Sequence, residues 1–275
     1  MRKTTPRFIL ACSLTVLLLS VVVFAPLLAP YDPQAQIFGS LTPPDARHWL
    51  GTDRLGRDLL SRLLLGLQTS VLATLLLVSL VAVIGTTVGM LAGFLGGFVD
   101  RCLMRVTDLF LALPGLVFAL AVAALLGGGL LTAVLALTLV SWPKYARLAR
   151  SLTRSTKQTD YVSAARLAGS STWRITYRHV LPNIIGPILV TACLDIGTLM
   201  MELAGLSFLG LGVQPPTAEL GQMMSAGRSL FQTYPWVVLS PGVLIFLTVV
   251  IFNLMADTLR DRAERRIPLT HSGKS

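Results

Sequence analysis

Asp160-Tyr-Val-Ser-Ala-Ala-Arg-Leu-Ala-Gly169, which runs on to Leu181-Pro182, is the stretch that decides how this chain is organised. It is polar and basic, and it separates two long apolar segments. Its alanine and leucine residues favour a helix, which Gly169 ends or bends. A second helical piece, 170–180, is expected to stop at Pro182. The pattern predicts two short amphipathic helices with a glycine elbow, outside the bilayer and suited to docking a partner protein. An ordinary cytoplasmic loop is the alternative.

The composition is that of a membrane protein. Hydrophobic residues make up 53% of the chain, charged residues only 13%, and the mean hydropathy is +0.72. A soluble domain of this length usually carries about 25% charged residues. The sequence therefore predicts several membrane spans packed into one bundle.

The net charge of +10 does not indicate nucleic-acid binding. The chain has 23 Lys and Arg residues. In the topology described below, 18 of them, including Lys144, lie in the cytoplasm, and five arginines lie outside. Those five are Arg47, Arg54, Arg57, Arg62 and Arg228. This asymmetry sets the orientation by the positive-inside rule. The cysteines lack metal or redox spacing and are expected to be small buried residues: Cys12, Cys102 and Cys193.

Six apolar runs predict an all-α, multi-pass protein with both termini in the cytoplasm. They cover residues 8–28, 70–95, 109–126, 130–148, 183–204 and 236–256. The first run is too long for a signal peptide and lacks a small-x-small cleavage site, so an uncleaved span is favoured.

Several breaks are expected between and within these runs. Segment 31–67 is a polar outer excursion whose Asp and Arg residues pair, and 96–108 is a short polar turn with local salt bridges. Pro114 kinks the third run, and Pro241-Gly242 breaks the sixth. Segment 205–212 is too short to span and reads as a re-entrant or surface piece.

Four glycines recur at intervals of four residues along one helix face: Gly85, Gly89, Gly93 and Gly97. Such a stripe lets a second helix approach backbone to backbone. The prediction is a close helix–helix contact rather than a binding role.

Two carboxylates lie inside the fifth run. Asp195 and Glu202 are seven residues apart and share a helix face, with Met201 beside them. Ionisable residues in a span are costly and usually face a cavity or a partner. They are candidates for a translocation pathway, Asp195 more than Glu202, which could instead lie at the outer interface. Pairing with charges on another subunit is the alternative, and methionine usually serves packing. No firm metal site is predicted.

The loop motif resembles a known family. Ser163-Ala164-Ala165, Gly169 and Leu181-Pro182 resemble the "EAA" loop of bacterial ATP-binding-cassette (ABC) importer permeases. The resemblance implies that these six residues form a coupling helix and its elbow, seated in a groove of a cytoplasmic ATPase. Ser163 stands where the family usually has Glu, and His179 where an apolar residue is usual.

Three further motifs resemble the peptide/nickel subgroup of these permeases. They are the Gly-Thr-Asp and Gly-Arg-Asp sequences within 51–58, the Asp-Met-Arg-Asp spacing within 100–108, and the Ser-Phe-Leu-Gly-Leu-Gly and Pro-Pro sequences within 207–216. The resemblance covers residues 31–261. It implies the type I importer permease fold and a bacterial cytoplasmic (inner) membrane location.

The resemblance also implies a division of the chain and a set of partners. Residues 1–69 hold the first span and outer segment, 70–265 the permease core with coupling loop 160–182, and 266–275 a cytoplasmic tail. Expected partners are a second homologous permease, two cytoplasmic ATP-binding subunits, an extracytoplasmic solute-binding protein and membrane lipid. The chain is then a transport subunit rather than an enzyme, without a cofactor of its own, and ATP and Mg bind the partner ATPases.

The substrate is less well defined by the sequence. Asp195-Ile-Gly197 with Met200-Met201, and Pro216-Thr-Ala-Glu219, look more like nickel permeases than dipeptide permeases. The predicted spans contain no histidine, so a nickel chelate or metallophore is favoured over free nickel. A dipeptide or oligopeptide importer permease is the first alternative, and an ion-coupled secondary transporter the second. A membrane enzyme would need a catalytic constellation that the spans do not offer.

Overall fold

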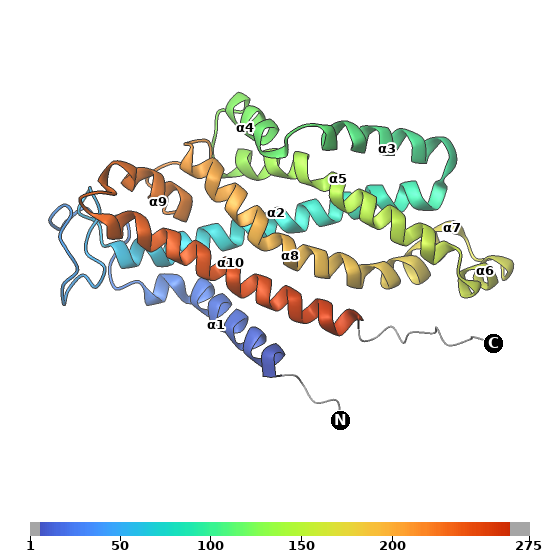
Figure 1. Cartoon of the computed structure of the whole chain (residues 1–275), viewed down its shortest axis with the longest axis horizontal. Helices are drawn as coiled ribbons and strands as arrows, with labels where there is room; N and C mark the ends of the chain where they lie inside the picture. The colour runs from blue at the N-terminus through green and yellow to red at the C-terminus, as the bar shows by residue number, and fades with distance from the viewer. Residues whose placement is uncertain (1–5, 265–275) are drawn as a thin grey trace.

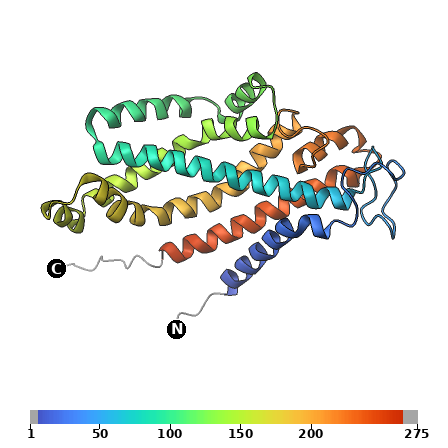
Figure 2. The same cartoon turned by 180° about the vertical axis from the view of Figure 1, so that it is seen from behind.

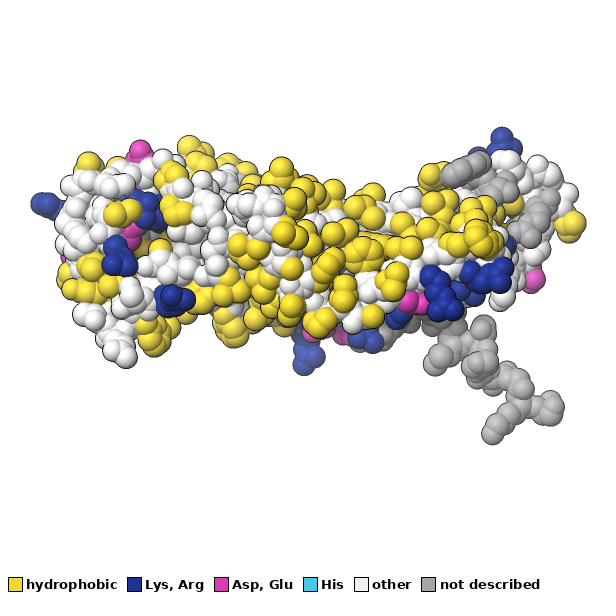
Figure 3. Space-filling view, turned by 90° about the horizontal axis from the view of Figure 1, so that it is seen from above, with side chains coloured by type: hydrophobic (Ala, Val, Ile, Leu, Met, Phe, Trp, Pro, Cys, Tyr) yellow, Lys and Arg dark blue, Asp and Glu magenta, His cyan; other side chains and the backbone are white. Residues whose placement is uncertain are grey.

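The computed structural model describes residues 6–264, and its helices lie along one long axis (Figure 1). In chain order they are α1 (Pro6–Leu28), α2 (Leu59–Leu95), α3 (Gly97–Ala112), α4 (Gly115–Leu125), α5 (Leu130–Lys157), α6 (Asp160–Leu167), α7 (Thr172–Ile175), the π-helical turn η1 (Thr176–Val180), α8 (Leu181–Phe208), α9 (Leu220–Gly227), the 3-10 turn η2 (Arg228–Leu230) and α10 (Pro235–Glu264). Apolar side chains cover the middle of the molecule, and Lys and Arg gather mainly toward its ends (Figure 3). This distribution suits a bundle that crosses a bilayer.

Four helical segments are long and apolar enough to span a membrane: Pro6–Leu28, Leu59–Leu95, Thr176–Phe208 and Pro235–Arg262. The pair α3 and α4 makes a fifth if it counts as one broken span, since the two helices meet at 91° around Pro114. The basic second half of α5 keeps that helix outside this apolar class. The multi-pass, all-helical prediction is confirmed among the described residues, whereas the count of six spans is not reached.

Two predicted boundaries in the first half of the chain are wrong. α2 begins at Leu59 rather than Ser70, because Asp58 caps it by accepting a hydrogen bond from the Ser61 N–H at 2.8 Å. Segment 97–112 is helix α3 rather than a short turn. α3 runs beside α5, so long-range packing supports a segment that looks too polar to be a span (Figure 1).

Two predicted breaks in the second half are also absent. α8 continues to Phe208, so the first half of the expected re-entrant piece is its last turn, and the second half is a bend around Gly210 at φ +85°. Pro241 lies inside α10 without interrupting it. Proline removes one backbone hydrogen bond, and tertiary packing here outweighs that loss.

The glycine stripe forms the contact between α2 and α5. A Cβ on Gly85 would meet the Trp142 carbonyl oxygen at 2.5 Å, and one on Gly89 would meet the Ala146 oxygen at 2.2 Å. Gly93 faces Thr153 in the same way. Gly97 lies outside α2 with open space around it, so the predicted stripe holds for three glycines and not for the fourth.

The two ends of the bundle differ in character. Segment 29–58 and α9 lie at one end, whereas α6 and α7 lie at the other (Figure 1). α2 runs along much of the length between the two ends, and α1 begins and α10 finishes toward the α6 end (Figure 2). The predicted tail, 266–275, and five predicted cytoplasmic charges lie outside the described residues: Arg2, Lys3, Arg265, Arg266 and Lys274.

Candidate functional site

The loop 160–182 is anchored to the bundle by a small apolar cluster of its own. Val162 and Ile175 are buried against Met90 and Phe94 of α2, and Val180 and Ile184 complete the group. This cluster is separate from the main core. It holds the loop against α2 at this end of the bundle.

The outward surface of the loop carries the predicted coupling residues. Ser163 and Ala164 are exposed, Ala165 is half-buried, and Leu167 is 90% exposed. Gly169 has a φ of +77°, in the left-handed region that favours glycine, and a Cβ there would meet nothing within 4 Å. The glycine is therefore needed for the backbone turn rather than for close packing, and the predicted elbow is confirmed.

The second half of the loop departs from the prediction. α7, η1 and α8 follow one another without a break, so Leu181-Pro182 lies at the start of α8 and does not end a helix. Pro182 has no N–H to donate, and it lies where the π-helical turn η1 passes into α8, so the backbone hydrogen-bond pattern changes at this junction. A movement of the elbow can therefore reach α8 directly.

The basic half of α5 is tied to α3 by ion pairs. Asp100 is buried and accepts hydrogen bonds from Arg150, with Nη2–Oδ2 at 2.7 Å, and from Arg154 at 2.5 Å. Arg147 pairs with Asp108 at 2.6 Å. The salt-bridge role predicted for these aspartates is present, but the partners are on α5 and not local. The helix that leads into α6 is thus joined to α3.

The predicted pathway carboxylate Asp195 has a partner within this chain. Its Oδ1 lies 2.6 Å from Nζ of Lys144 on α5, and the residue is only 8% exposed. Both residues line a cavity of about 230 Å³, which Ser141 and Thr198 also line. The prediction allowed for a partner charge on another subunit, and it counted Lys144 only as an inner-face charge. The pairing with Lys144 was missed.

Glu202 and Met201 lie along the same side of α8. Glu202 lines the cavity that contains Asp195 and also a second, of about 390 Å³, which Met201 and Asn253 line. Both cavities share Thr198 as well. We call the two together the central cavity. The three residues singled out from the sequence are thus brought together along one wall.

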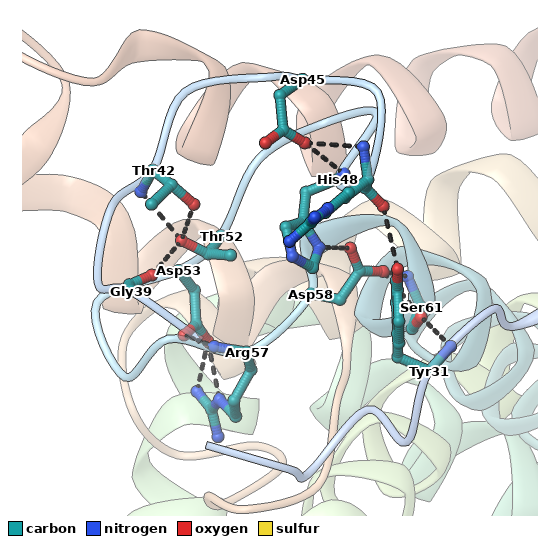
Figure 4. Close-up of polar contacts among 11 residues, drawn as sticks. Tyr31, Gly39, Thr42, Asp45, His48, Thr52, Asp53, Arg57, Asp58 and Ser61 are labelled. Carbon is teal, nitrogen blue, oxygen red and sulfur yellow. Dashed lines mark hydrogen bonds and ion pairs between the residues drawn. The ribbon is translucent and has the colours of Figure 1, made fainter. Parts of the chain in front are cut away.

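The outer segment is held by its own polar network (Figure 4). Nδ1 of His48 lies 3.0 Å from Oδ1 of Asp58, and Nε of Arg57 donates to Oδ2 of Asp53 at 2.7 Å. The backbone N–H groups of His48 and Arg47 donate to Asp45 and hold the pKa of its carboxyl below the usual value. The predicted Asp–Arg pairing is confirmed, and the glycine-aspartate sequences within 51–58 serve the fold of this segment.

Glu219 has a structural position. It is fully buried and caps α9, accepting from the N–H groups of Gly221 and Gln222 at 3.1 and 2.8 Å. The Ser70 hydroxyl donates to its Oε1 at 2.9 Å and ties the cap to α2. Glu219 belongs to the Pro216-Thr-Ala-Glu219 motif that favoured nickel, but in the structure its side chain stabilises the start of α9.

The described residues, 6–264, contain no cluster of three or more His, Cys, Asp or Glu placed to hold a metal ion. The cysteines within that range are free, and Cys102 is exposed, so its predicted burial is wrong. Cys12 and Cys193 are half-buried.

Residues 85–268 match the family described as "binding-protein-dependent transport system inner membrane component". This range contains the coupling loop and all the lining residues of the central cavity. The chain belongs to this family. Its members are multi-pass inner membrane proteins, and the predicted ABC permease family is confirmed.

Permeases of the peptide/nickel group are similar along nearly the whole chain. A "probable D,D-dipeptide transport system permease protein" of Escherichia coli K12 is 43% identical over 95% of this chain and 88% of its own length. A di/tripeptide permease of Pseudomonas aeruginosa is 45% identical over 89% and 83%. The nickel transport system permease protein of Escherichia coli K12 is 41% identical over 88% of each chain. The chain is a permease of the peptide/nickel group.

Solved structures support the type I permease fold. A chain of the MetNI methionine ABC transporter, in an inward facing conformation, superposes with a TM-score of 0.58 and 20% identity. The match covers 71% of this permease and 94% of that chain. At this identity the likeness concerns the fold alone.

Proposed function

We propose that this permease moves a small charged solute through the central cavity, driven by partner ATPases that dock on α6. The observation that carries the proposal is that α5 leads into the coupling loop and that the loop leads into α8. The same two helices hold the docking loop at one end and present Lys144 and Asp195 to the cavity further along. A displacement of the loop therefore changes the cavity wall.

The mechanism is alternating access driven from outside the chain. ATP binding closes two partner ATPases, which moves the α6 loops of this permease and of a second, homologous permease. The attached α5 and α8 helices then rock, and the pathway opens on the other face. ATP and Mg bind the partner ATPases, and this chain supplies the movement of its helices.

The orientation follows from charge. Segment 29–58 and α9 face the extracytoplasmic side, whereas the coupling loop and the described ends of the chain face the cytoplasm. The support is the basic character of α5 near the loop, with Arg147, Arg150 and Arg154 on the inner side. An extracytoplasmic solute-binding protein delivers the solute to the outer end.

We propose a short peptide as the main substrate class. Lys144 offers a positive group, and Glu202 a negative one, on one cavity wall, which suits the two opposite charges of a zwitterion. Dipeptide permeases are among the similar proteins, at 43% and 45% identity. The absence of a metal-ligand cluster among residues 6–264 does not favour direct contact with bare nickel.

Transport of a nickel chelate is the second candidate. A nickel permease is 41% identical over 88% of this chain, so similarity alone does not separate the two substrates. A chelate would present its own carboxylates to Lys144 and would need no protein ligands.

Uptake in cells that lack the chain tests both candidates. Labelled dipeptide and radioactive nickel, the latter with and without an added chelator, are measured before and after the chain is restored. Restored dipeptide uptake with unchanged nickel uptake supports the peptide proposal. Restored nickel uptake alone contradicts it. Uptake that persists without the partner ATPases contradicts an ATP-driven mechanism and favours a secondary transporter.

A further inference from the structure

A separate cavity lies at the outer end of the bundle. It measures about 550 Å³ and is lined by loop residues 53–57, the first turn of α2, α9 and the start of α10. None of its lining residues belongs to the central cavity. We call it the outer cavity. Segment 29–58 and α9, which supply much of its lining, lie at one end of the bundle (Figure 1).

The outer cavity carries an excess of positive charge. Asp53 supplies its carboxylate to two guanidinium groups, Arg57 at 2.7 Å and Arg62 at 3.5 Å. Arg62 is only 2% exposed, and no second carboxylate lines the cavity. Arg54, which is exposed, adds a third cation at the rim of the cavity. Its Nη1 donates a hydrogen bond to the Ser229 hydroxyl at 3.2 Å. Nη1 of Arg62 also donates to the carbonyl oxygens of Pro33 and Pro216, at 3.1 and 3.5 Å. Three arginines against one aspartate give the cavity lining a net charge of +2, which favours an added anion.

Gln222 provides a second, independent sign of a ligand. Gln222 lines the cavity and is only 8% exposed, and its Oε1 has no hydrogen-bond partner among residues 6–264. A buried carbonyl oxygen without a donor costs free energy. This oxygen is closed off from solvent in the present side-chain conformation, so Gln222 would turn into the cavity to accept a hydrogen bond from the N–H of a bound backbone. Guanidinium groups for a carboxylate and an acceptor for an N–H together suit an acidic stretch of polypeptide.

We propose that the outer cavity receives an acidic loop of the solute-binding protein, with a carboxylate near Arg57 and Arg62 and a backbone N–H on Gln222. The proposal rests on the proposed function, which supplies an extracytoplasmic binding protein. A cavity of about 550 Å³ holds several side chains rather than a single ion. Complementary charge across an interface speeds encounter and fixes its orientation.

The test places a carboxylate inside the cavity in advance. Ala226 is an exposed lining residue on α9, so Ala226→Glu supplies an internal anion and Ala226→Gln is its size-matched neutral control. The whole transporter is assembled in lipid nanodiscs, and the affinity of the solute-binding protein that supports wild-type uptake is measured. We expect docking about tenfold weaker for Ala226→Glu and within about twofold of wild type for Ala226→Gln. Arg54→Gln, which removes the rim cation, is expected to weaken docking by about threefold.

Equal docking of the Glu and Gln variants overturns the proposal. The proposal is also overturned if Ala226→Glu docks as tightly as wild type while a free dipeptide protects wild type, but not this variant, against thermal unfolding. That result would mean that the cavity binds a small carboxylate. A wild-type complex whose ATP hydrolysis does not respond to the solute-binding protein would instead contradict the proposed function. The two failures are thus distinguished.

Discussion

Lys144 on α5 and Asp195 on α8 form an ion pair with an Nζ–Oδ1 distance of 2.6 Å at the wall of the central cavity. The pair joins the two helices that flank the coupling loop. It is asymmetric, since the Lys144 side chain is 59% exposed and that of Asp195 only 12%. The carboxylate is therefore the fixed member, and the ammonium group is the one that a solute can reach.

Asp195→Asn is expected to reduce uptake at least tenfold. The neutral side chain leaves Lys144 without its partner, and a cation inside a span costs free energy when it is unpaired. Stability is expected to fall by only about 1 kcal/mol, because the exposed lysine is partly solvated. Labelled dipeptide uptake, normalised to the amount of chain in the membrane, measures the effect. The exchanged pair Lys144→Asp with Asp195→Lys should recover part of the uptake, and normal transport by Asp195→Asn would contradict a pathway role.

Gly169→Pro is expected to insert normally and to lose ATP-coupled uptake. A φ of +77° is closed to proline, so the elbow must change its direction. Gly169→Ala should be affected less, through a strain of about 1–2 kcal/mol. Gly186→Ala is the control, because this helical glycine also has open space around its missing Cβ and gains helix propensity. Uptake at equal membrane levels is the measurement, and full coupling in Gly169→Pro would remove the elbow from the mechanism.

Asp100→Asn is expected to weaken the connection between α3 and α5. The substitution removes the negative charge that Arg150 and Arg154 share. Because both arginines are partly exposed, we expect a loss of about 1 kcal/mol in stability. Less uptake per ATP hydrolysed, in a complex that still binds its ATPases, is the expected result. The matched variant Asp108→Asn affects a half-exposed pair and should change uptake less, and an equal loss for both would show that burial of Asp100 is unimportant.

Glu219→Ala is expected to destabilise α9 by about 2 kcal/mol. It removes a buried cap and leaves the Ser70 hydroxyl and two backbone N–H groups without an acceptor. Thermal unfolding of the purified chain in detergent measures the loss. The effect should be independent of nickel, and nickel-dependent stabilisation that vanishes in this variant would instead make Glu219 a metal ligand.

The features predicted correctly from the sequence are the ones with short-range causes. Gly169 turns the chain locally, Asp53 and Arg57 are four residues apart, and Gly85 and Gly89 share a face through helical periodicity. In each case the neighbours along the chain are also neighbours in space. Pattern and spacing alone are then sufficient.

The features that were missed depend on long-range packing. Asp100 and Arg150 are 50 residues apart, and Lys144 and Asp195 are 51 apart, so their pairing needs the bundle. The wrong break at Pro241 has the same cause, because packing keeps α10 continuous where local propensity favours an interruption. No spacing rule connects charges on helices whose relative position is unknown.

The central claim is that α6 docks on a cytoplasmic ATPase, and site-directed crosslinking from its exposed face tests this most directly. The chain first needs its own cysteines replaced, since Cys102 is exposed. Ser163→Cys is then introduced on α6, with Leu125→Cys, an 87% exposed position on α4, as the control. A thiol-to-amine crosslinker is applied to the assembled transporter, and a membrane-impermeant thiol label is applied to intact cells.

We expect Ser163→Cys to crosslink to the ATPase in a way that changes with ATP, and Leu125→Cys not to crosslink. We also expect no labelling of Ser163→Cys from outside the cell. Labelling of Ser163→Cys in intact cells, without any crosslink to the ATPase, would contradict the central claim.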